Sequence, residues 1–211
     1  MAMDLGRYHA LAAYPYFTYG SLMDAAVFAC VTGQRPQVRG PGWLEGQRRT
    51  RLANQSFPMV DDQAGCRVFG LVLEPTGVEA LARLHTYETA DYRLELRQVA
   101  CLEGVVDALV FEPSGRAAAG SEIWHLADWQ SASKPMVLWV QQQIAERLPM
   151  PDFDPWPSGD TAPEQQDAFA HYMEQSDRLF DQLEALWHAQ NSEAGKGDLD
   201  ALGHRSINHL R

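Results

Sequence analysis

The stretch Phe17-Thr18-Tyr19-Gly20-Ser21-Leu22-Met23 joins an aromatic, β-rich run at residues 14–19 to the expected start of a helix near Asp24. A strand that enters a glycine turn and a helix start leaves several backbone N–H groups without intrahelical partners. Together with the helix dipole, these groups favour a bound carboxylate or a developing oxyanion. Gly20 has no Cβ and permits a ligand to approach the backbone closely. Because such triplets also occur in ordinary turns, the stretch alone leaves both interpretations open.

The length and charge of the chain limit the classes of protein to which it can belong. Its 211 residues suffice for one sizeable domain, or for one domain with an extension. The formal net charge of −11 argues against nucleic acid and against anionic membrane surfaces as partners. Most of the acidic excess lies after residue 112, so the part of the chain before it is nearly balanced in charge.

The cysteines, histidines and N-terminus predict a soluble, cytoplasmic protein without a metal. Cys30, Cys66 and Cys101 are odd in number and lack C-x-x-C spacing, which favours reduced thiols over a disulfide framework. The histidines show no ligand spacing relative to these cysteines, which argues against zinc. Residues 1–13 carry Asp4 and lack a basic start before a long apolar run, unlike a signal peptide. We also find no apolar run long enough to span a bilayer.

Two short helices are expected in the first half of the chain. The first begins after Asp24, which can cap it, and ends at Gly33. The second opens with Thr76 and Glu79 at capping-box spacing and ends near Glu88. Its apolar stripe consists of Val78, Leu81, Ala82 and Leu84.

The other segments before residue 113 read as five or six strands and one loop. The strongest strand, residues 66–73, is nearly continuous in apolar residues and is therefore expected to be central. Residues 56–65 are expected to form a loop. The further strands are expected at residues 14–19, 38–45 (a bulged edge strand), 47–52, 92–102 and 105–112. Since no repeated β-α-β spacing appears, we predict an α+β fold, a small mixed β-barrel with short helices, over residues 14–112.

The second half of the chain, residues 113–190, is expected to form a helical extension. Trp124 and Trp129 are expected to dock onto the barrel, and residues 133–148 form an amphipathic helix. A proline-rich connector at residues 149–160 and a capping box at residues 161–164 precede a long helix. The apolar stripe of that helix is Phe169, Tyr172, Met173, Phe180, Leu183 and Trp187.

The stripe is expected to be a packing face, either on the same barrel or on a second subunit. The C-terminal helices are therefore a candidate homodimer interface. The polar tail, residues 191–211, is expected to be poorly packed.

Three arginines, Arg48, Arg49 and Arg51, lie in the polar strand at residues 47–52. They can form a solvated strand face, or one of them can neutralise a substrate carboxylate.

A second candidate site is Leu84-His85-Thr86-Tyr87-Glu88-Thr89-Ala90-Asp91-Tyr92, in which Glu88 ends an apolar helix stripe. The chain thus contains YGSL, then a strand with a central glycine, Val68-Phe69-Gly70-Leu71-Val72, and then L-x-x-Y-E-x-x-x-Y. This ordered set resembles the gamma-glutamylcyclotransferase-like family, over about residues 14–112. The resemblance implies a barrel with a cavity between the YGSL loop and the glutamate.

The resemblance also implies an activity, the release of 5-oxoproline from a γ-glutamyl compound without a metal or cofactor. Glu88 would be the general acid and base. Its pKa would have to be raised by burial, since an ordinary glutamate is a poor base at neutral pH. The implied substrate-binding residues are Tyr19, Gly20, Ser21, Leu22 and Tyr92, the two tyrosines supplying hydroxyls and the turn supplying amides.

The match departs from the family pattern at three positions. His85 stands where the family often has Asp, Thr89 where it has Gly, and Leu94 at the usual Arg position, next to Arg93. These departures leave a second interpretation open, in which the same cavity binds a small carboxylate or amine without catalysis. A hydrolase with Ser21 as the nucleophile fits less well, because the G-x-S-x-G elbow is missing.

Overall fold

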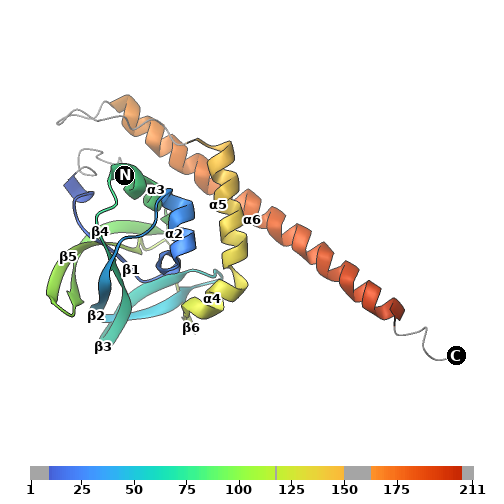
Figure 1. Ribbon diagram of the computed structural model, residues 1–211, viewed down its shortest axis with the longest axis horizontal. Helices are drawn as coiled ribbons and strands as arrows, with labels where there is room; N and C mark the ends of the chain where they lie inside the picture. The colour runs from blue at the N-terminus through green and yellow to red at the C-terminus, as the bar shows by residue number, and fades with distance from the viewer. Residues whose placement is uncertain (1–9, 117, 150–162, 206–211) are drawn as a thin grey trace.

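The computed structural model describes residues 10–116, 118–149 and 163–205 of the chain. Five strands in the order β3-β1-β5-β4-β2 close into a barrel because β2 also pairs with β3. Strand β1 runs antiparallel to β3 and parallel to β5, so the barrel is mixed. This α+β barrel with short helices confirms the predicted fold class (Figure 1). The barrel strands are β1 (Tyr16–Thr18), β2 (Val38–Leu52), β3 (Pro58–Leu73), β4 (Tyr92–Cys101) and β5 (Gly104–Pro113).

The longest strands, β2 and β3, differ from the prediction in two respects. Residues 38–52 form one strand, which pairs with β3 on one side and with β4 and the short β6 (Ala119–Ile123) on the other. The predicted edge strand is therefore wrong, although the predicted irregularity is present as register shifts at Val38/Gly40 and Glu45/Gln47. The loop predicted at residues 56–65 is also wrong, because residues 58–62 pair with residues 47–51. Barrel closure supplies partners for polar residues that look like a loop in the sequence.

The glycine in the central strand marks the place where two strands lie in closest contact. A Cβ atom at Gly70 would lie 2.2 Å from the carbonyl oxygen of Thr18 and 2.8 Å from the Phe17 ring. No side chain fits there, so β1 can lie directly against β3 only with glycine at this position. This contact fixes the end of β1, from which the YGSL turn begins.

The helix next to the turn begins as predicted. Helix α2 (Ala25–Thr32) is capped by Asp24, whose Oδ1 accepts hydrogen bonds from the Ala26 and Val27 amides at 3.0 and 3.2 Å. The turn before it is a single 3-10 turn, η1 (Ser21–Met23). Helix α3 (Val78–Glu88) ends at the predicted residue, but the predicted capping box is wrong. Its N-cap is Gly77, and no side chain caps the helix.

Hydrophobic residues form a core inside the barrel and a larger core between the barrel and the helices. Inside the barrel, Phe17 packs with Val99 and Val110. Between the layers, Leu81 and Leu84 of α3 pack with Tyr16, Leu109 and Phe111. Successive residues of β1 therefore face opposite cores, as alternation along a strand requires.

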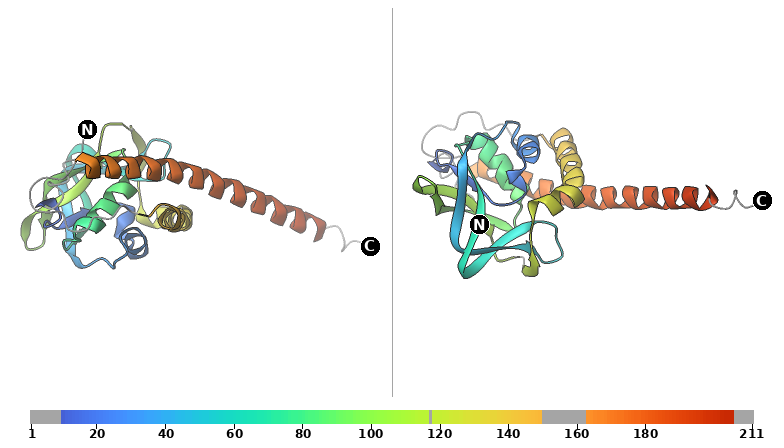
Figure 2. Two further views of the ribbon diagram at one scale, coloured as in Figure 1. Left: turned by 90° about the horizontal axis from the view of Figure 1, so that it is seen from above. Right: turned by 60° about the horizontal axis from the view of Figure 1, so that its bottom comes forward.

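The C-terminal helices cover one side of the barrel (Figure 2). They are α4 (Leu126–Ala132), α5 (Lys134–Arg147) and α6 (Pro163–Arg205). Trp124 and Trp129 are both buried, which confirms their predicted docking. The connector and the start of the second capping box, at residues 150–162, lie outside the described residues.

The apolar stripe of α6 packs on its own chain. Phe169 and Tyr172 contact Ala82 of α3, and Trp187 lies 5.5 Å from Trp139 of α5 between ring centroids. This part of the stripe is therefore covered by the same chain. A homodimer through the C-terminal helices stays a prediction. The backbone of α6 continues through part of the predicted tail to Arg205 and extends away from the barrel (Figure 1).

An ion pair connects the turn region to α5. Asp24 Oδ2 accepts hydrogen bonds from Lys134 Nζ and Gln130 Nε2, both at 2.6 Å. Burial alone would raise the pKa of Asp24, but the hydrogen bonds from Lys134, Gln130 and the Val27 amide lower it below its usual value. The ionised carboxylate therefore holds η1, α2 and α5 together.

We expect Asp24→Ala to lower the free energy of unfolding by about 2–3 kcal/mol, because it removes a helix cap and leaves Lys134 unpaired. Urea unfolding measures this loss. The control is Asp128→Ala, an exposed carboxylate in the first turn of α4, which should change stability by less than about 0.5 kcal/mol. Equal effects of the two substitutions would show that the Asp24 contacts do not stabilise the fold.

Candidate functional site

Glu88, at the C-terminal end of α3, borders two hollows. The smaller one, which we call the inner cavity, is about 20 Å³ and lies between Glu88, residues 19–21 and Pro58. The larger one, the outer pocket, is about 550 Å³ and lies between residues 54–57, the end of α3 and one face of α6. The inner cavity holds about one water molecule, whereas the outer pocket can hold a small ligand.

Four buried tyrosines, Tyr16, Tyr19, Tyr87 and Tyr92, surround Glu88. Burial, followed by the nearby Glu88 charge, raises the pKa of each phenol above its usual value. The phenols are therefore neutral at every physiological pH. They supply an apolar wall with oriented hydroxyl groups.

The hydroxyl groups of Tyr19, Tyr87 and Tyr92 already have hydrogen-bond partners. Tyr19 donates to the Phe111 carbonyl oxygen at 2.7 Å, and Tyr92 donates to the Pro58 carbonyl oxygen. The Tyr87 and Ser21 hydroxyls share a hydrogen bond of 2.8 Å. Tyr19 and Tyr92 thus line the inner cavity as predicted, but they direct their protons to backbone carbonyls. Their phenol oxygens can still accept a hydrogen bond.

Glu88 itself is partly buried and faces this aromatic wall. Burial raises its pKa to about 8. Among the residues whose side chains the structure describes, we find no hydrogen bond or ion pair to its carboxylate. A carboxyl group that is desolvated and unpaired is typical of functional sites, because it is costly to maintain in a purely structural role.

The residues of the turn have different positions at the site. Gly20 is explained by packing, since a Cβ atom there would lie 2.7 Å from Pro58 Cγ. The side chain of Leu22 is buried in the core between barrel and helices. Ser21 is buried, and its hydroxyl partner is Tyr87 rather than a histidine. Burial raises the pKa of Tyr87, so its phenol stays protonated and cannot accept the Ser21 proton, and the interpretation of Ser21 as a nucleophile gains no support.

The backbone amides of Ser21 and Leu22 are the first of η1, where a helix provides no acceptors. In the part of the chain that the structure describes, neither amide donates a hydrogen bond to another group. The next two amides, of Met23 and Asp24, donate to the carbonyl oxygens of Gly20 and Ser21, so they are not available to an anion, whereas those of Ser21 and Leu22 are.

The three arginines of residues 47–52, which are part of β2, lie outside both hollows. Arg48 pairs with Asp61 at 2.7 Å and Arg51 with Glu122 at 3.2 Å. Arg49 donates to the Tyr19 carbonyl oxygen at 2.7 Å and lies 5.2 Å from the centre of the Trp124 ring. Arg49 therefore stabilises the start of the turn through the Tyr19 carbonyl group and is not placed to bind a ligand.

Of the three departures from the family pattern, Thr89 lines the outer pocket, whereas His85 and Leu94, with Arg93 beside it, do not. His85 packs edge-on against Phe111 at 5.4 Å, and burial lowers its pKa to about 4, so it is a neutral core residue. Arg93 pairs with Glu95 at 3.2 Å. It therefore does not take the place of an arginine at the site.

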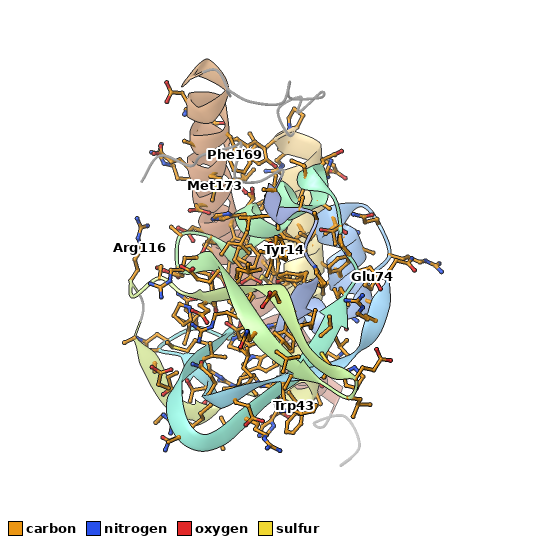
Figure 3. The ribbon with its side chains drawn as sticks, turned by 90° about the vertical axis from the view of Figure 1, so that its left-hand side faces the viewer. Tyr14, Trp43, Glu74, Arg116, Phe169 and Met173 are labelled. Atoms are coloured by element: carbon orange, nitrogen blue, oxygen red, sulfur yellow. The ribbon has the colours of Figure 1, made fainter. Side chains whose placement is uncertain are left out.

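The wall that α6 contributes to the outer pocket was not predicted from the sequence. The residues that line it, at helical spacing, are Phe180 of the apolar stripe and the polar residues Asp177, Asp181, Glu184 and His188. The spacing shows that these residues share a helix face, but not that this face meets Glu88. Figure 3 shows Arg116, a further lining residue, on the loop after β5 at the side of the barrel.

We find no cluster of three or more histidine, cysteine or carboxylate residues that could hold a metal ion in the described part of the chain. Cys30, Cys66 and Cys101 are free thiols. None of the helices described is both long and apolar enough to cross a membrane.

The fold and the site define a class, an α+β barrel protein with a buried glutamate beside a strand-to-helix turn. The chain belongs to the gamma-glutamyl cyclotransferase, AIG2-like family, whose sequence profile matches residues 16–131. The match ends within α4, so α5 and α6 lie beyond it. A search of curated proteins finds no match.

Similar solved structures include a solution structure of a protein from Arabidopsis thaliana, which is 17% identical with a TM-score of 0.47. It covers 71% of this chain and 92% of its own. A structure named gamma-glutamyl cyclotransferase is 14% identical with a TM-score of 0.43, covering 75% of this chain and 98% of its own. An uncharacterized protein from Homo sapiens is 12% identical with a TM-score of 0.44, covering 74% and 98%.

We expect Glu88→Gln to stabilise the protein at alkaline pH. The pKa of Glu88 is about 8 in the folded chain and 4.5 for an ordinary glutamate, the value expected in the unfolded chain. Between these two pH values the folded chain therefore keeps a proton on Glu88 that the unfolded chain loses. Stability from this group is therefore complete below about pH 4.5 and is lost as the pH rises through 8. The glutamine, which cannot ionise, should raise the free energy of unfolding by up to about 4 kcal/mol at pH 8.5 and by almost nothing near pH 4.5. Urea unfolding at both pH values measures the difference, and the exposed Glu103→Gln should show none.

We expect Thr89→Gly to raise the free energy of unfolding by about 1 kcal/mol. Thr89 has φ 59° and ψ −174°, a conformation almost confined to glycine, and it stands where the family pattern has glycine. Relief of this strain exceeds the entropy that glycine loses on folding and the weak 3.3 Å hydrogen bond from the Asp91 amide. Thermal unfolding measures the gain. Ala90→Gly, the control at the next residue, should lower stability instead.

Proposed function

We propose that this protein is a cyclotransferase that releases 5-oxoproline from a γ-glutamyl amine or peptide. The observation that supports this proposal best is Glu88, a desolvated carboxyl group bordering both the turn and a pocket of about 550 Å³. Membership of the cyclotransferase family adds to this support. The γ-glutamyl group carries its own nucleophile, so a site of this kind needs only to fold the substrate and move a proton.

The reaction closes a five-membered ring. The α-amine nitrogen attacks the γ-carbonyl carbon, a new C–N bond forms, and the original amide C–N bond breaks. The products are 5-oxoproline and the leaving amine. An attacking group that is already tethered can be worth effective molarities on the order of 10⁵–10⁸ M once it is well oriented. The aromatic wall around Glu88 limits the conformations that the glutamyl group can adopt.

Glu88 carries the proton from the attacking amine to the leaving amine. An α-ammonium group has a pKa of about 8, so a carboxylate with a pKa of 4.5 would be a weak base toward it. Because burial raises the pKa of Glu88 to about 8, the two groups are matched and the proton moves at little cost. The same protonated carboxyl group then donates to the leaving nitrogen.

Charge that develops on the carbonyl oxygen, or the substrate α-carboxylate, is bound by the amides of Ser21 and Leu22. The turn is held by the Asp24 cap and by Arg49, so these amides need little reorganisation. Tyr19 and Tyr92 position the turn and the Pro58 segment through their hydrogen bonds to backbone carbonyls.

We expect Glu88→Gln to lower kcat for 5-oxoproline release by about 10²–10⁴-fold, the usual contribution of a general acid–base group. The assay quantifies 5-oxoproline from a panel of γ-glutamyl compounds by chromatography. Glu103→Gln, the same change on an exposed turn, should keep wild-type turnover. Ser21→Ala should retain a substantial rate, whereas complete loss with a trapped acyl-enzyme in the wild type would indicate a serine mechanism instead.

A second candidate is a binding module without turnover. The observation in its favour is the volume of the inner cavity, about 20 Å³, which admits one water but not a glutamyl group. In that case a small amine or carboxylate would occupy the outer pocket alone. Folded wild-type protein that releases no 5-oxoproline across the panel, yet binds a γ-glutamyl compound in calorimetry, would establish this alternative.

A further inference from the structure

The outer pocket has one wall that belongs to α6, outside the stretch that matches the family. Asp177, Asp181 and Glu184 of this wall are four and three residues apart, so they lie on one helix face. Asp91, just after α3, faces them from the opposite side of the pocket. The pocket that opens on Glu88 therefore carries four further carboxylates.

These carboxylates lie close to one another, and too few positively charged side chains lie near them to balance their charge. Burial, then the charges of Asp181 and Asp91, raise the pKa of Asp177 to about 6, and Arg116 opposes this effect. Asp177 Oδ1 is buried and has no hydrogen-bond partner among the described residues. The pocket thus holds closely spaced negative charge that a bound cation would stabilise.

Another carboxylate on the same helix behaves differently. Glu174 is exposed and pairs with Arg178 at 3.6 Å, the usual pattern of a solvated helix face. Within the described residues, Asp177, Asp181 and Glu184 make no such ion pair, and Arg116 is the only arginine or lysine that lines the pocket. His188 lies at its rim. The charge on this wall is therefore not balanced by the protein itself.

The substrates of the proposed reaction share the glutamyl half and differ in the leaving amine. A leaving group that is an amino acid or peptide carries a carboxylate, which this wall would repel. A leaving group that is an alkyl diamine carries an ammonium group, which the wall would attract. The apolar residues Phe57, Met136 and Phe180 line the same pocket and can pack against an alkyl chain.

We propose that the acidic face of α6, formed by Asp177, Asp181 and Glu184, selects γ-glutamyl amines whose leaving group bears a second positive charge and no carboxylate. This inference rests on the proposed cyclotransferase function. The glutamyl half reacts at Glu88, and the ammonium end of the leaving amine extends to α6. These three residues set specificity and take no part in bond making.

The test uses three synthetic substrates with leaving groups of equal length: γ-glutamyl-1,4-diaminobutane, γ-glutamyl-pentylamine and γ-glutamyl-4-aminobutanoate. They end in an ammonium, a methyl and a carboxylate group. For the wild-type chain we expect kcat/KM to fall in that order, with at least a tenfold step between the first two. Raising the salt concentration should reduce this step, since screening weakens charge–charge attraction.

Substitutions on α6 then locate the selectivity. Asp177→Asn with Asp181→Asn should lower the ratio of kcat/KM for the cationic over the methyl-ended substrate by about tenfold. Asp181→Lys, at an exposed position that tolerates the change, should lower this ratio further and tests the proposal if the double variant does not fold. Asp167→Asn removes the same charge from an exposed site of α6 outside the pocket and should leave the ratio unchanged.

The outcomes separate the two proposals. If neither these three substrates nor the wider panel of γ-glutamyl compounds yields 5-oxoproline, the proposed function itself is wrong, whereas release only from γ-glutamyl peptides would leave the cyclotransferase standing and overturn the selectivity. If all three are turned over but the cationic substrate has no advantage, or the α6 variants leave the ratio at its wild-type value, the cyclotransferase stands and the selectivity is wrong.

Discussion

The close contact between β1 and β3 determines where everything else at the site can lie. Because Gly70 has no side chain, the carbonyl of Thr18 approaches it closely, and β1 fits between β3 and β5. The chain then turns at Gly20, again under steric restriction from Pro58, and starts η1 beside the end of α3. The two glycines, Gly70 and Gly20, thus fix the position of the turn relative to Glu88. Packing alone explains why glycine is needed at both positions.

The site has an energetic asymmetry. Three tyrosine hydroxyls around Glu88 have hydrogen-bond partners: Tyr19 and Tyr92 donate to carbonyl groups, and Tyr87 shares a hydrogen bond with Ser21. Glu88 is left with burial but without a compensating partner, so its ionised form is disfavoured. A structural carboxylate would be expected to have the reverse arrangement, as Asp24 does with three kinds of donor. This contrast between the two carboxyl groups makes Glu88 the candidate functional group and Asp24 a structural one.

The spacing of residues in the sequence predicted the elements that depend on local chemistry. The Asp24 cap, the end of α3 at Glu88 and the hairpin of β4 and β5 each follow from neighbouring residues. The predictions that were wrong depend on distant partners. Residues 58–62 form a strand only because β2 lies beside them, and Thr76 fails to cap α3 because Gly77 takes that place.

The candidate site was predictable in part for the same reason. Tyr19, Gly20, Ser21 and Glu88 could be selected because two short motifs suggested a common cavity, and the structure brings them to one cavity. The contribution of α6 could not be selected in this way. Its acidic residues read as a solvated helix face until the fold shows that residues about 90 positions from Glu88 in the sequence border the same pocket.

Glu88 and the charged wall of the pocket therefore come from different parts of the chain. Glu88 and the turn lie in the stretch that matches the family, whereas α6 lies beyond it. The charge on α6 can change without disturbing the contacts that position Glu88, since Asp181 is exposed and the α6 stripe packs through Phe169 and Leu183. If the chain acts as proposed, this barrel can keep one reaction and alter the leaving groups that it accepts, because Phe169 and Leu183, which help to hold α6 in place, do not line the pocket.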